Sequence, residues 1–200
     1  MLLPRFAVCT FSLGAMVLSG GIVSAQGFPA KPIRIVSAEV GGGNDFAARV
    51  VAQGLSAMGQ PVIVDNRPSG VIPGSIVSKA PPDGYTLLAY GVSLWIAPLL
   101  QDDIPYDPVR DFAPVTLVAN SPGVLVVYPG LTVKSAGELI ALAKAKPGYL
   151  NYASTSTGSP PHLAAELFKF MAGVDIVRIL YKGMGPALID LMSGQVHLAF

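Results

Sequence analysis

The chain has 200 residues, of which 52% are hydrophobic, and it carries 13 lysine and arginine residues against 12 aspartate and glutamate residues. This length suffices for one domain or two small ones with a buried core, and the balanced charge argues against nucleic acid or an anionic membrane surface as a partner. Because the only histidines are His162 and His197 and no run of carboxylates has ligand spacing, no metal site is expected.

The one long apolar run lies at the N-terminus, between Phe6 and Val23 and just after Arg5. Its cationic start and the small residues that follow it are typical of a secretory signal peptide rather than a membrane anchor. We expect cleavage after Ala25 and no membrane insertion of the mature chain. The single cysteine, Cys9, lies inside this segment, so disulfides, thiolate catalysis and cysteine metal sites are excluded from the mature chain.

The first segment of the mature chain combines a strand, a glycine turn and a helix start. The apolar residues of 33–36 predict the strand, Gly41, Gly42 and Gly43 allow a turn that side chains would forbid, and Asn44 or Asp45 is expected to cap the helix. Amides at such a helix start point outward, and the helix dipole favours negative charge there. The segment therefore predicts an anion site, with an ordinary strand-to-helix connection as the alternative.

Helical spacing predicts which side of this first helix is buried. The expected apolar face consists of Phe46, Ala47, Val50, Val51, Gly54, Leu55 and Met58.

Strands and helices are then expected to alternate up to residue 100, which is typical of an α/β fold. The predicted elements are strands at Pro61–Asp65 and Tyr85–Tyr90, a short helix over residues 74–80 and a helix at Ser93–Leu100. In the last of these, Trp95 and Leu99 are one helical turn apart and are predicted to lie in the core.

A change of composition follows. Residues 102–114 hold three prolines and four aspartates, which predicts an irregular crossing between two domains, 26–104 and 105–200. Two strands are expected beyond it, at Val115–Ala119 and Gly123–Tyr128. Ser135 and Glu138 then form a capping box that marks the next helix start.

A second strand-loop-helix unit has a loop rich in hydroxyl groups. The strand Tyr149–Ala153 is followed by residues 154–159, with Ser159 as the expected N-cap and Pro160 at the first helical position. His162 lies in the first helical turn and either faces a ligand or is packed. The hydroxyl groups are either ligand contacts or solvated caps.

The last predicted elements are a strand at Asp175–Leu180, a helix at Pro186–Met192 and a strand over residues 195–200. Because the chain stops inside an apolar strand, we expect it to be a fragment of a longer protein.

Short segments spread over the whole mature chain carry a family resemblance. They are Lys31-Pro32-Ile33-Arg34, Gly42-Gly43 with Asp45 and Ala48-Arg49, Gly59-Gln60-Pro61-Val62, Asn66-Arg67-Pro68, Ala80-Pro81 with residues 83–88, residues 105–115, Leu150-Asn151-Tyr152, His162-Leu163-Ala164 and Tyr181-Lys182-Gly183. In these segments the chain resembles the Bug family, the periplasmic substrate-binding receptors of tripartite tricarboxylate transporters.

The resemblance implies an α/β, two-lobed, periplasmic binding protein-like fold (type II, Venus-flytrap), truncated at the C-terminus. It implies a periplasmic solute-binding protein, not an enzyme, that captures a small organic acid and delivers it to the membrane components of a tripartite tricarboxylate transporter. No cofactor and no nucleic acid partner are implied.

Carried over position by position, the resemblance also implies the ligand-binding residues. They are Val40, Gly41, Gly42, Gly43, Asn44 and Asp45 in a first loop, Gly91 and Ser93 in another, and Ser154, Thr155, Ser156, Thr157, Gly158 and Ser159 in a second ligand loop, joined by His162. Three features depart from the family pattern. The turn after Arg67, residues 69–73, is poorer in glycine than is usual in the family. Glu39 stands beside the expected anion site, and Pro160-Pro161 stiffens the second loop.

Three other functions are alternatives for the same sequence. A dinucleotide-binding oxidoreductase would use the first glycine turn with Asp65 as its ribose-binding acid, but its last small position is occupied by Phe46. A hydrolase lacks a nucleophile or metal motif in this sequence. An exported sensor that signals to a membrane receptor needs the same cleft as a transport receptor, so both stay open.

Overall fold

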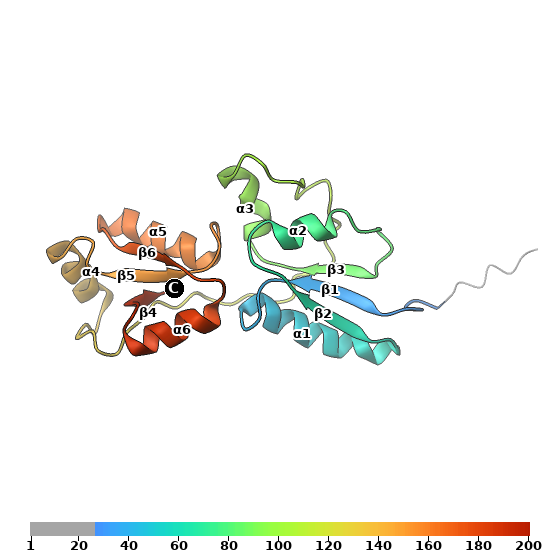
Figure 1. Ribbon diagram of the computed structural model, residues 1–200, viewed down its shortest axis with the longest axis horizontal. Coiled ribbons are helices and arrows are strands. Elements are labelled where there is room, and N and C mark those ends of the chain that lie inside the picture. The colour runs from blue at the N-terminus through green and yellow to red at the C-terminus, as the bar shows by residue number, and fades with distance from the viewer. Residues whose placement is uncertain (1–26) are drawn as a thin grey trace, which may run out of the picture.

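The computed structural model describes residues 27–200 and shows two α/β lobes side by side, joined by one crossing of the chain (Figure 1). The two-lobed α/β fold expected from the resemblance is confirmed. The predicted signal peptide, its cleavage site and Cys9 lie outside the described residues. No helix within residues 27–200 combines the length and the apolar character needed to cross a membrane.

The first lobe is built on a parallel three-stranded sheet with the order β2-β1-β3. Its elements are β1 (Ile33–Ser37), α1 (Gly43–Leu55), a 3-10 turn (Ser56–Met58), β2 (Val62–Asn66), α2 (Ile72–Val77), β3 (Thr86–Ala89) and α3 (Ser93–Leu100). Strand β1 is central and buries apolar residues on both faces, Ile33 and Ile35 on one and Val36 on the other. Ile35 pairs with Val64 and Leu87 and is almost fully buried.

The second lobe holds a four-stranded sheet with the order β4-β7-β5-β6, in which β4 alone runs antiparallel to its neighbour. Its elements are β4 (Val126–Val127), α4 (Ala136–Ala145), β5 (Asn151–Ser154), α5 (Pro160–Ala172), β6 (Val177–Leu180), α6 (Met184–Ser193) and β7 (Leu198–Ala199). Buried side chains of Leu139, Leu150, Tyr152, Ile176 and Leu198 form its core.

The predicted capping box is confirmed at the start of α4. Ser135 is the N-cap, and its Oγ accepts a hydrogen bond of 3.2 Å from the Glu138 amide. The Glu138 carboxylate accepts in return from the amide of Lys134, at 2.7 Å, one residue earlier than the usual box.

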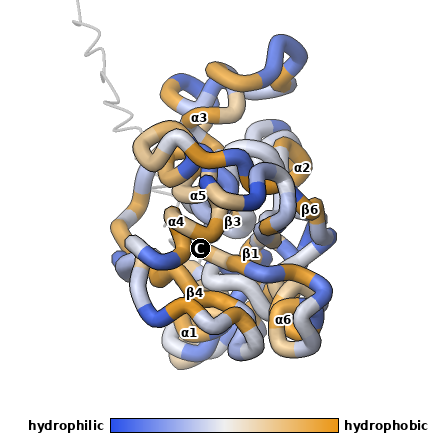
Figure 2. The backbone as a smooth tube through the Cα atoms, turned by 90° about the vertical axis from the view of Figure 1, so that its left-hand side faces the viewer, coloured by the Kyte–Doolittle hydropathy of each residue, from blue (hydrophilic) through white to orange (hydrophobic). Residues whose placement is uncertain are grey.

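The buried face of α1 differs from the prediction. Asp45, Ala48 and Ala52 face the sheet, whereas Phe46 is 72% exposed and Val50 52% exposed. Small alanine side chains let the helix lie close to the sheet. Of the predicted apolar face, Val51 and Leu55 are half-buried and pack against this core as expected, whereas Phe46 and Val50 are left outside. Figure 2 likewise shows hydrophobic stretches on the outer helices α1 and α6.

The prediction that Trp95 and Leu99 lie in the core is wrong, since they are 49% and 82% exposed. Leu94 and Ala97 are the buried apolar residues of α3. Helix α3 packs on α2 through Leu94. The Leu94 side chain and the Tyr106 ring both lie close to Gly74 in α2.

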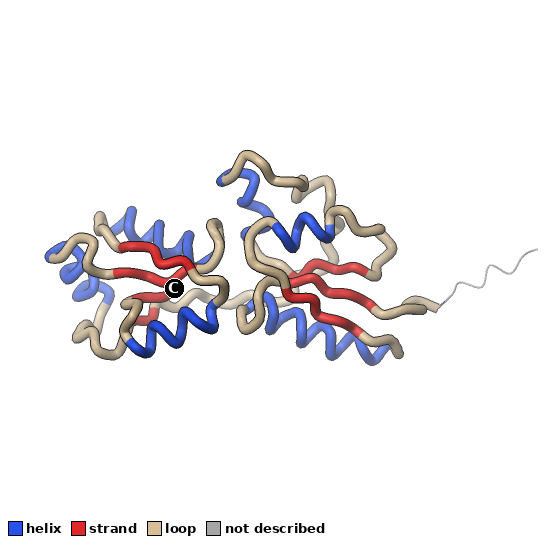
Figure 3. The backbone as a smooth tube through the Cα atoms, in the orientation of Figure 1, coloured by secondary structure: helices blue, strands red, loops and turns tan. Residues whose placement is uncertain are grey.

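The crossing between the lobes contains less regular structure than predicted. No strand forms at 115–119, and only Val126–Val127 of the second predicted strand is paired. Figure 3 shows this stretch as loop. Strand propensity is realised only where a neighbouring strand offers hydrogen bonds, and no strand within residues 27–200 pairs with 115–119. Val115 and Leu117 are therefore exposed.

Candidate ligand-binding site

The loops that the sequence and the resemblance singled out meet at the junction of the lobes, where α1, α5 and α6 all begin (Figure 1). Ser93 Oγ of the first lobe donates a buried hydrogen bond of 3.1 Å to the carbonyl of Gly158 in the second. A Cβ added to Gly70 would lie 3.9 Å from the Cβ of Ser156. Loops at the carboxyl ends of parallel strands are the usual ligand sites of open α/β sheets.

The first loop closes on itself through Asp45. Gly41 has a φ of +84°, a conformation that favours glycine, and its amide donates a hydrogen bond of 3.0 Å to Asp45 Oδ2. The expected cap at Asn44 or Asp45 is wrong, because the N-cap of α1 is Gly42. Asp45 is used instead to hold the turn that precedes the helix.

Asp45 is also the centre of a buried polar network. Its Oδ1 pairs with Arg49 Nε at 2.9 Å and accepts from Asn66 Nδ2 at 2.8 Å, and Asn66 Nδ2 also donates to the carbonyl of Ala38 at 2.7 Å. Burial by itself raises the pKa of Asp45, but hydrogen bonds from Gly41, Arg49 and Asn66 outweigh it, so the pKa lies below its ordinary value of 3.8. Asp45 therefore positions the loop.

This network predicts a pH-dependent contribution to stability. A carboxyl group whose pKa is lowered by folding stabilises the native state above its unfolded pKa of 3.8, and the contribution is lost as the pH falls below that value through the folded pKa. We expect Asp45→Asn to lower the free energy of unfolding at pH 7 by on the order of 2 kcal/mol. Urea unfolding at a series of pH values should show the difference from the wild type shrinking as the pH falls below about 4, where the unfolded chain takes up the proton.

The exposed Asp103, which makes no hydrogen bond or ion pair within residues 27–200, provides the control. Asp103→Asn should leave stability unchanged across the same range. A loss for Asp45→Asn that stays constant down to pH 3 would contradict the role of its charge.

The glycine turn leaves backbone donors free. The amides of Gly42, Gly43 and Asn44 donate no hydrogen bond within the part of the chain that the structure describes. They lie at the N-terminal end of α1, where the dipole of a 13-residue helix favours an anion. Val40 is exposed beside them, and the Asn44 Oδ1 atom is directed toward Gly91, 3.4 Å from where a Cβ would stand.

The second loop is held by Arg178, a residue on β6 that the sequence did not single out. Its Nε donates to Ser154 Oγ at 2.6 Å, its Nη1 to Thr157 Oγ1 at 3.2 Å, and its Nη2 to the carbonyl of Thr155 at 3.1 Å. The parallel pairing of β5 with β6 brings Arg178 alongside the strand that precedes the loop. Three donors of one guanidinium thus hold three residues of the loop, Ser154, Thr155 and Thr157.

Two backbone amides of this second loop are already engaged. The amide of Gly158 donates to His162 Nδ1 at 3.1 Å, and that of Ser159 donates to the carbonyl of Ser156 at 3.1 Å. Pro160 and Pro161 have no amide hydrogen. Ser159 is the N-cap position as predicted, but its side chain makes no cap bond.

Both amides and hydroxyl groups remain free here, because the amides of Thr155, Ser156 and Thr157 donate no hydrogen bond within residues 27–200. Ser156 Oγ and Ser159 Oγ are buried without a hydrogen-bond partner within residues 27–200, and Ser159 is only 4% exposed. A buried hydroxyl without a partner is costly. His162 is engaged through Nδ1, and its burial and the nearby Arg178 charge lower its pKa, so the neutral ring braces the loop.

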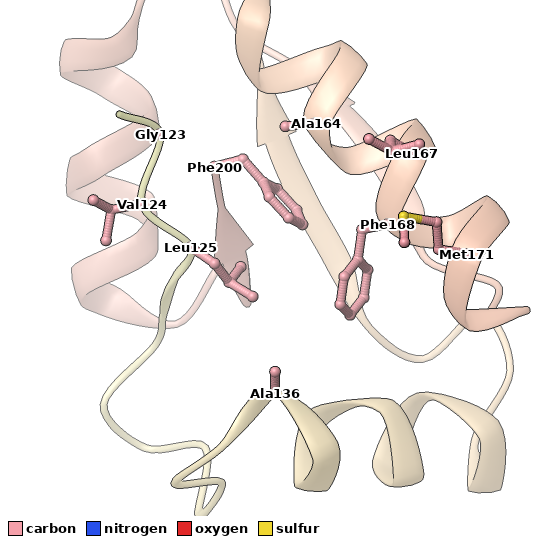
Figure 4. Close-up of a pocket in the computed structure, with 9 residues that line it drawn as sticks. All are labelled: Gly123, Val124, Leu125, Ala136, Ala164, Leu167, Phe168, Met171 and Phe200. Atoms are coloured by element: carbon pink, nitrogen blue, oxygen red, sulfur yellow. The ribbon is translucent and has the colours of Figure 1, made fainter. Parts of the chain in front are cut away.

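Three further observations concern other sites that the chain could hold. Asp65, the ribose-binding acid of the dinucleotide alternative, is paired with Arg34 and Arg67, so its carboxylate is already occupied. Figure 4 shows a pocket of about 380 Å³ in the second lobe, but its lining side chains, including Leu125, Phe168 and Phe200, are apolar. No group of histidine, cysteine, aspartate or glutamate residues in the described part of the chain is placed to hold a metal ion.

A protein-family model and known proteins match most of the chain. A family model described as "Tripartite tricarboxylate transporter family receptor" matches residues 47–200. The protein BugT of Bordetella pertussis is 42% identical over 193 residues, which cover 92% of this chain and 59% of BugT. The chain thus spans a little over half the length of the curated relatives it matches.

Solved structures show the same fold. R. palustris Rpa4515 with adipate is 40% identical, with a TM-score of 0.81 over 86% of this chain and 59% of that one. MatC from Rhodopseudomonas palustris with bound malate is 28% identical, with a TM-score of 0.76 over 86% of this chain and 60% of its own. The periplasmic binding protein BugD is 28% identical, with a TM-score of 0.78, and its chain is covered to 59%.

Proposed function

Because this chain belongs to the tripartite tricarboxylate transporter family receptors, we propose that it is a solute-binding protein that captures a small carboxylate between its two lobes and delivers it to the membrane components of such a transporter. Two of the solved relatives carry dicarboxylic acids, adipate and malate. We extend that class of ligand to this chain.

The observation that carries the proposal is the meeting of two sets of free donors at the lobe junction. The amides of Gly42, Gly43 and Asn44 belong to the first lobe, and the hydroxyls of Ser156 and Ser159 to the second. A carboxylate accepts hydrogen bonds through two oxygens, so it can be held by donors from both lobes. Binding would then favour the closed arrangement of the lobes.

Export belongs to the same proposal. A receptor of this kind must meet its ligand outside the cytoplasm, and residues 1–25 have the composition of a cleaved signal peptide. We propose cleavage after Ala25 and a periplasmic mature protein, so that N-terminal sequencing of periplasmic material begins at Gln26.

Binding is tested by thermal unfolding with adipate, malate and related di- and tricarboxylic acids. A ligand at a hundred times its dissociation constant stabilises the native state by about 2.7 kcal/mol, which raises the Tm of a chain of this size by roughly 5 to 10 °C. At least one acid should produce such a shift, with a midpoint that rises with concentration. If no carboxylic acid shifts the Tm while NAD or NADP does, the proposal fails and a dinucleotide site replaces it.

A further inference from the structure

Glu39 introduces a carboxylate into the proposed ligand site. It lies two residues after the end of β1 and is half-buried at the lobe junction. A Cβ added to Gly183, at the start of α6, would lie 2.9 Å from Glu39 Cγ, so the side chain is seated against the second lobe where only glycine leaves room.

The carboxylate of Glu39 is turned toward the first loop. Its Oε2 accepts a hydrogen bond from Ser69 Oγ, and its Oε1 lies 4.0 Å from where a Cβ on Gly42 would stand. Within residues 27–200, Oε1 has no hydrogen-bond partner and Glu39 forms no ion pair. A half-buried carboxylate with one oxygen unpaired therefore borders the free amides of the glycine turn.

The opposite side of the junction carries a positive charge. Arg178 donates only to neutral oxygens of the second loop, and no acidic group pairs with it in the described part of the chain. The other charged groups nearby are balanced, because Asp45 is paired with Arg49 and Glu166 with Lys169. Lys182 precedes Gly183 but is exposed. The two walls of the junction thus have opposite charge.

We propose, resting on the carboxylate-binding function above, that Glu39 determines specificity by pairing with an ammonium group of the ligand, so that the site takes amino acids in preference to simple dicarboxylates. The ligand carboxylate lies between the amides of the glycine turn and the hydroxyls of Ser156 and Ser159, and the ammonium group of the same ligand lies at Glu39 Oε1. A ligand without a cationic group brings a second negative charge next to Glu39, which is unfavourable in a partly desolvated site.

The test compares ligands that differ by one amino group. Calorimetric titration of the chain with succinate and L-aspartate, and with glutarate and L-glutamate, should show at least about tenfold tighter binding of the amino acid in the pair that fits, the size expected of one charge-assisted hydrogen bond. Glu39→Gln keeps the shape and an acceptor for Ser69 Oγ but removes the charge. It should reduce the ratio of the two dissociation constants at least about tenfold.

Controls separate the role of charge from a fault in folding. Glu138→Gln preserves the capping box of α4 and lies outside the site, so it should leave the ratio unchanged. Ser69→Ala removes the hydroxyl that orients Glu39 and should reduce the ratio less than Glu39→Gln does. If the simple acids bind as tightly as their amino counterparts, or if Glu39→Gln leaves the ratio unchanged, this inference fails while the proposed function stands. If neither kind of acid binds, both fail.

Discussion

Gly42→Val is expected to abolish carboxylate binding while the chain stays folded. Gly42 has φ −89° and ψ 169°, a conformation that valine adopts readily. An added Cβ would meet only Glu39 atoms, at 3.7 and 4.0 Å. The branched side chain would, however, occupy the space next to the free amides of Gly43 and Asn44. We expect affinity to fall by more than about 100-fold, as expected when two hydrogen bonds to a charged group are lost.

Gly137→Val is the matched control. Gly137 lies in the first turn of α4, and a Cβ there would contact only Ser135 Oγ at 3.8 Å. Both variants place valine at a helix start, but only Gly42 lies at the lobe junction. Titration with an acid that binds the wild type should show loss for Gly42→Val alone. Retained affinity in that variant, with an unchanged far-ultraviolet spectrum, would exclude the glycine turn from the site.

Replacing glycine by alanine should change stability in opposite directions at Gly74 and at Gly54. At Gly74 in α2 an added Cβ would lie 2.7 Å from Tyr106 Cε1 and 2.9 Å from Leu94 Cδ1, both of buried residues. Gly74→Ala should therefore reduce the free energy of unfolding by about 1 to 3 kcal/mol through overpacking. At Gly54 in α1 a Cβ would have no neighbour within 4 Å. Gly54→Ala should increase stability by about 0.5 to 1 kcal/mol through helix propensity.

Urea unfolding of the three chains measures both changes. The comparison is direct because both glycines are helical and neither has a positive φ. Equal stabilisation by the two alanines would mean that Tyr106 is not packed on α2 as the structure shows. The Tyr106 ring also ties the start of the inter-lobe crossing to the first lobe. It packs on α2 at Gly74, and Phe112 packs edge-on against it, with ring centroids 5.7 Å apart.

Much of the element order was predictable because its signals are local. The helix predicted at Ser93–Leu100 has those bounds in the structure, and the Ser135 capping box starts α4 as expected. Features that depend on distant partners were missed. Strand formation at 115–119 needs a neighbour, and the buried faces of α1 and α3 depend on how closely each helix approaches its sheet or the Tyr106 ring.

The candidate site likewise has a part that the sequence predicted and a part that it did not. Its loops were located from glycine and hydroxyl patterns and from the family resemblance, and the structure brings them together. The residues that hold the loops were not located, because Asn66 and Arg178 are separated by 21 and 24 residues from the side chains they bond, Asp45 and Ser154. A lone asparagine or arginine on a strand gives no signal in the sequence until strand pairing is known.

The separation of the two sheets has a consequence for the order of folding. Every strand pair of the first sheet lies between residues 33 and 89, and every strand pair of the second lies between 126 and 199. Domains of this kind fold as units, and the N-terminal one is completed first as the chain is synthesised. The first lobe can therefore form while the second is still unfolded. The Ser93–Gly158 bond joins the two units, so the junction, and with it the proposed ligand site, requires both lobes to be formed.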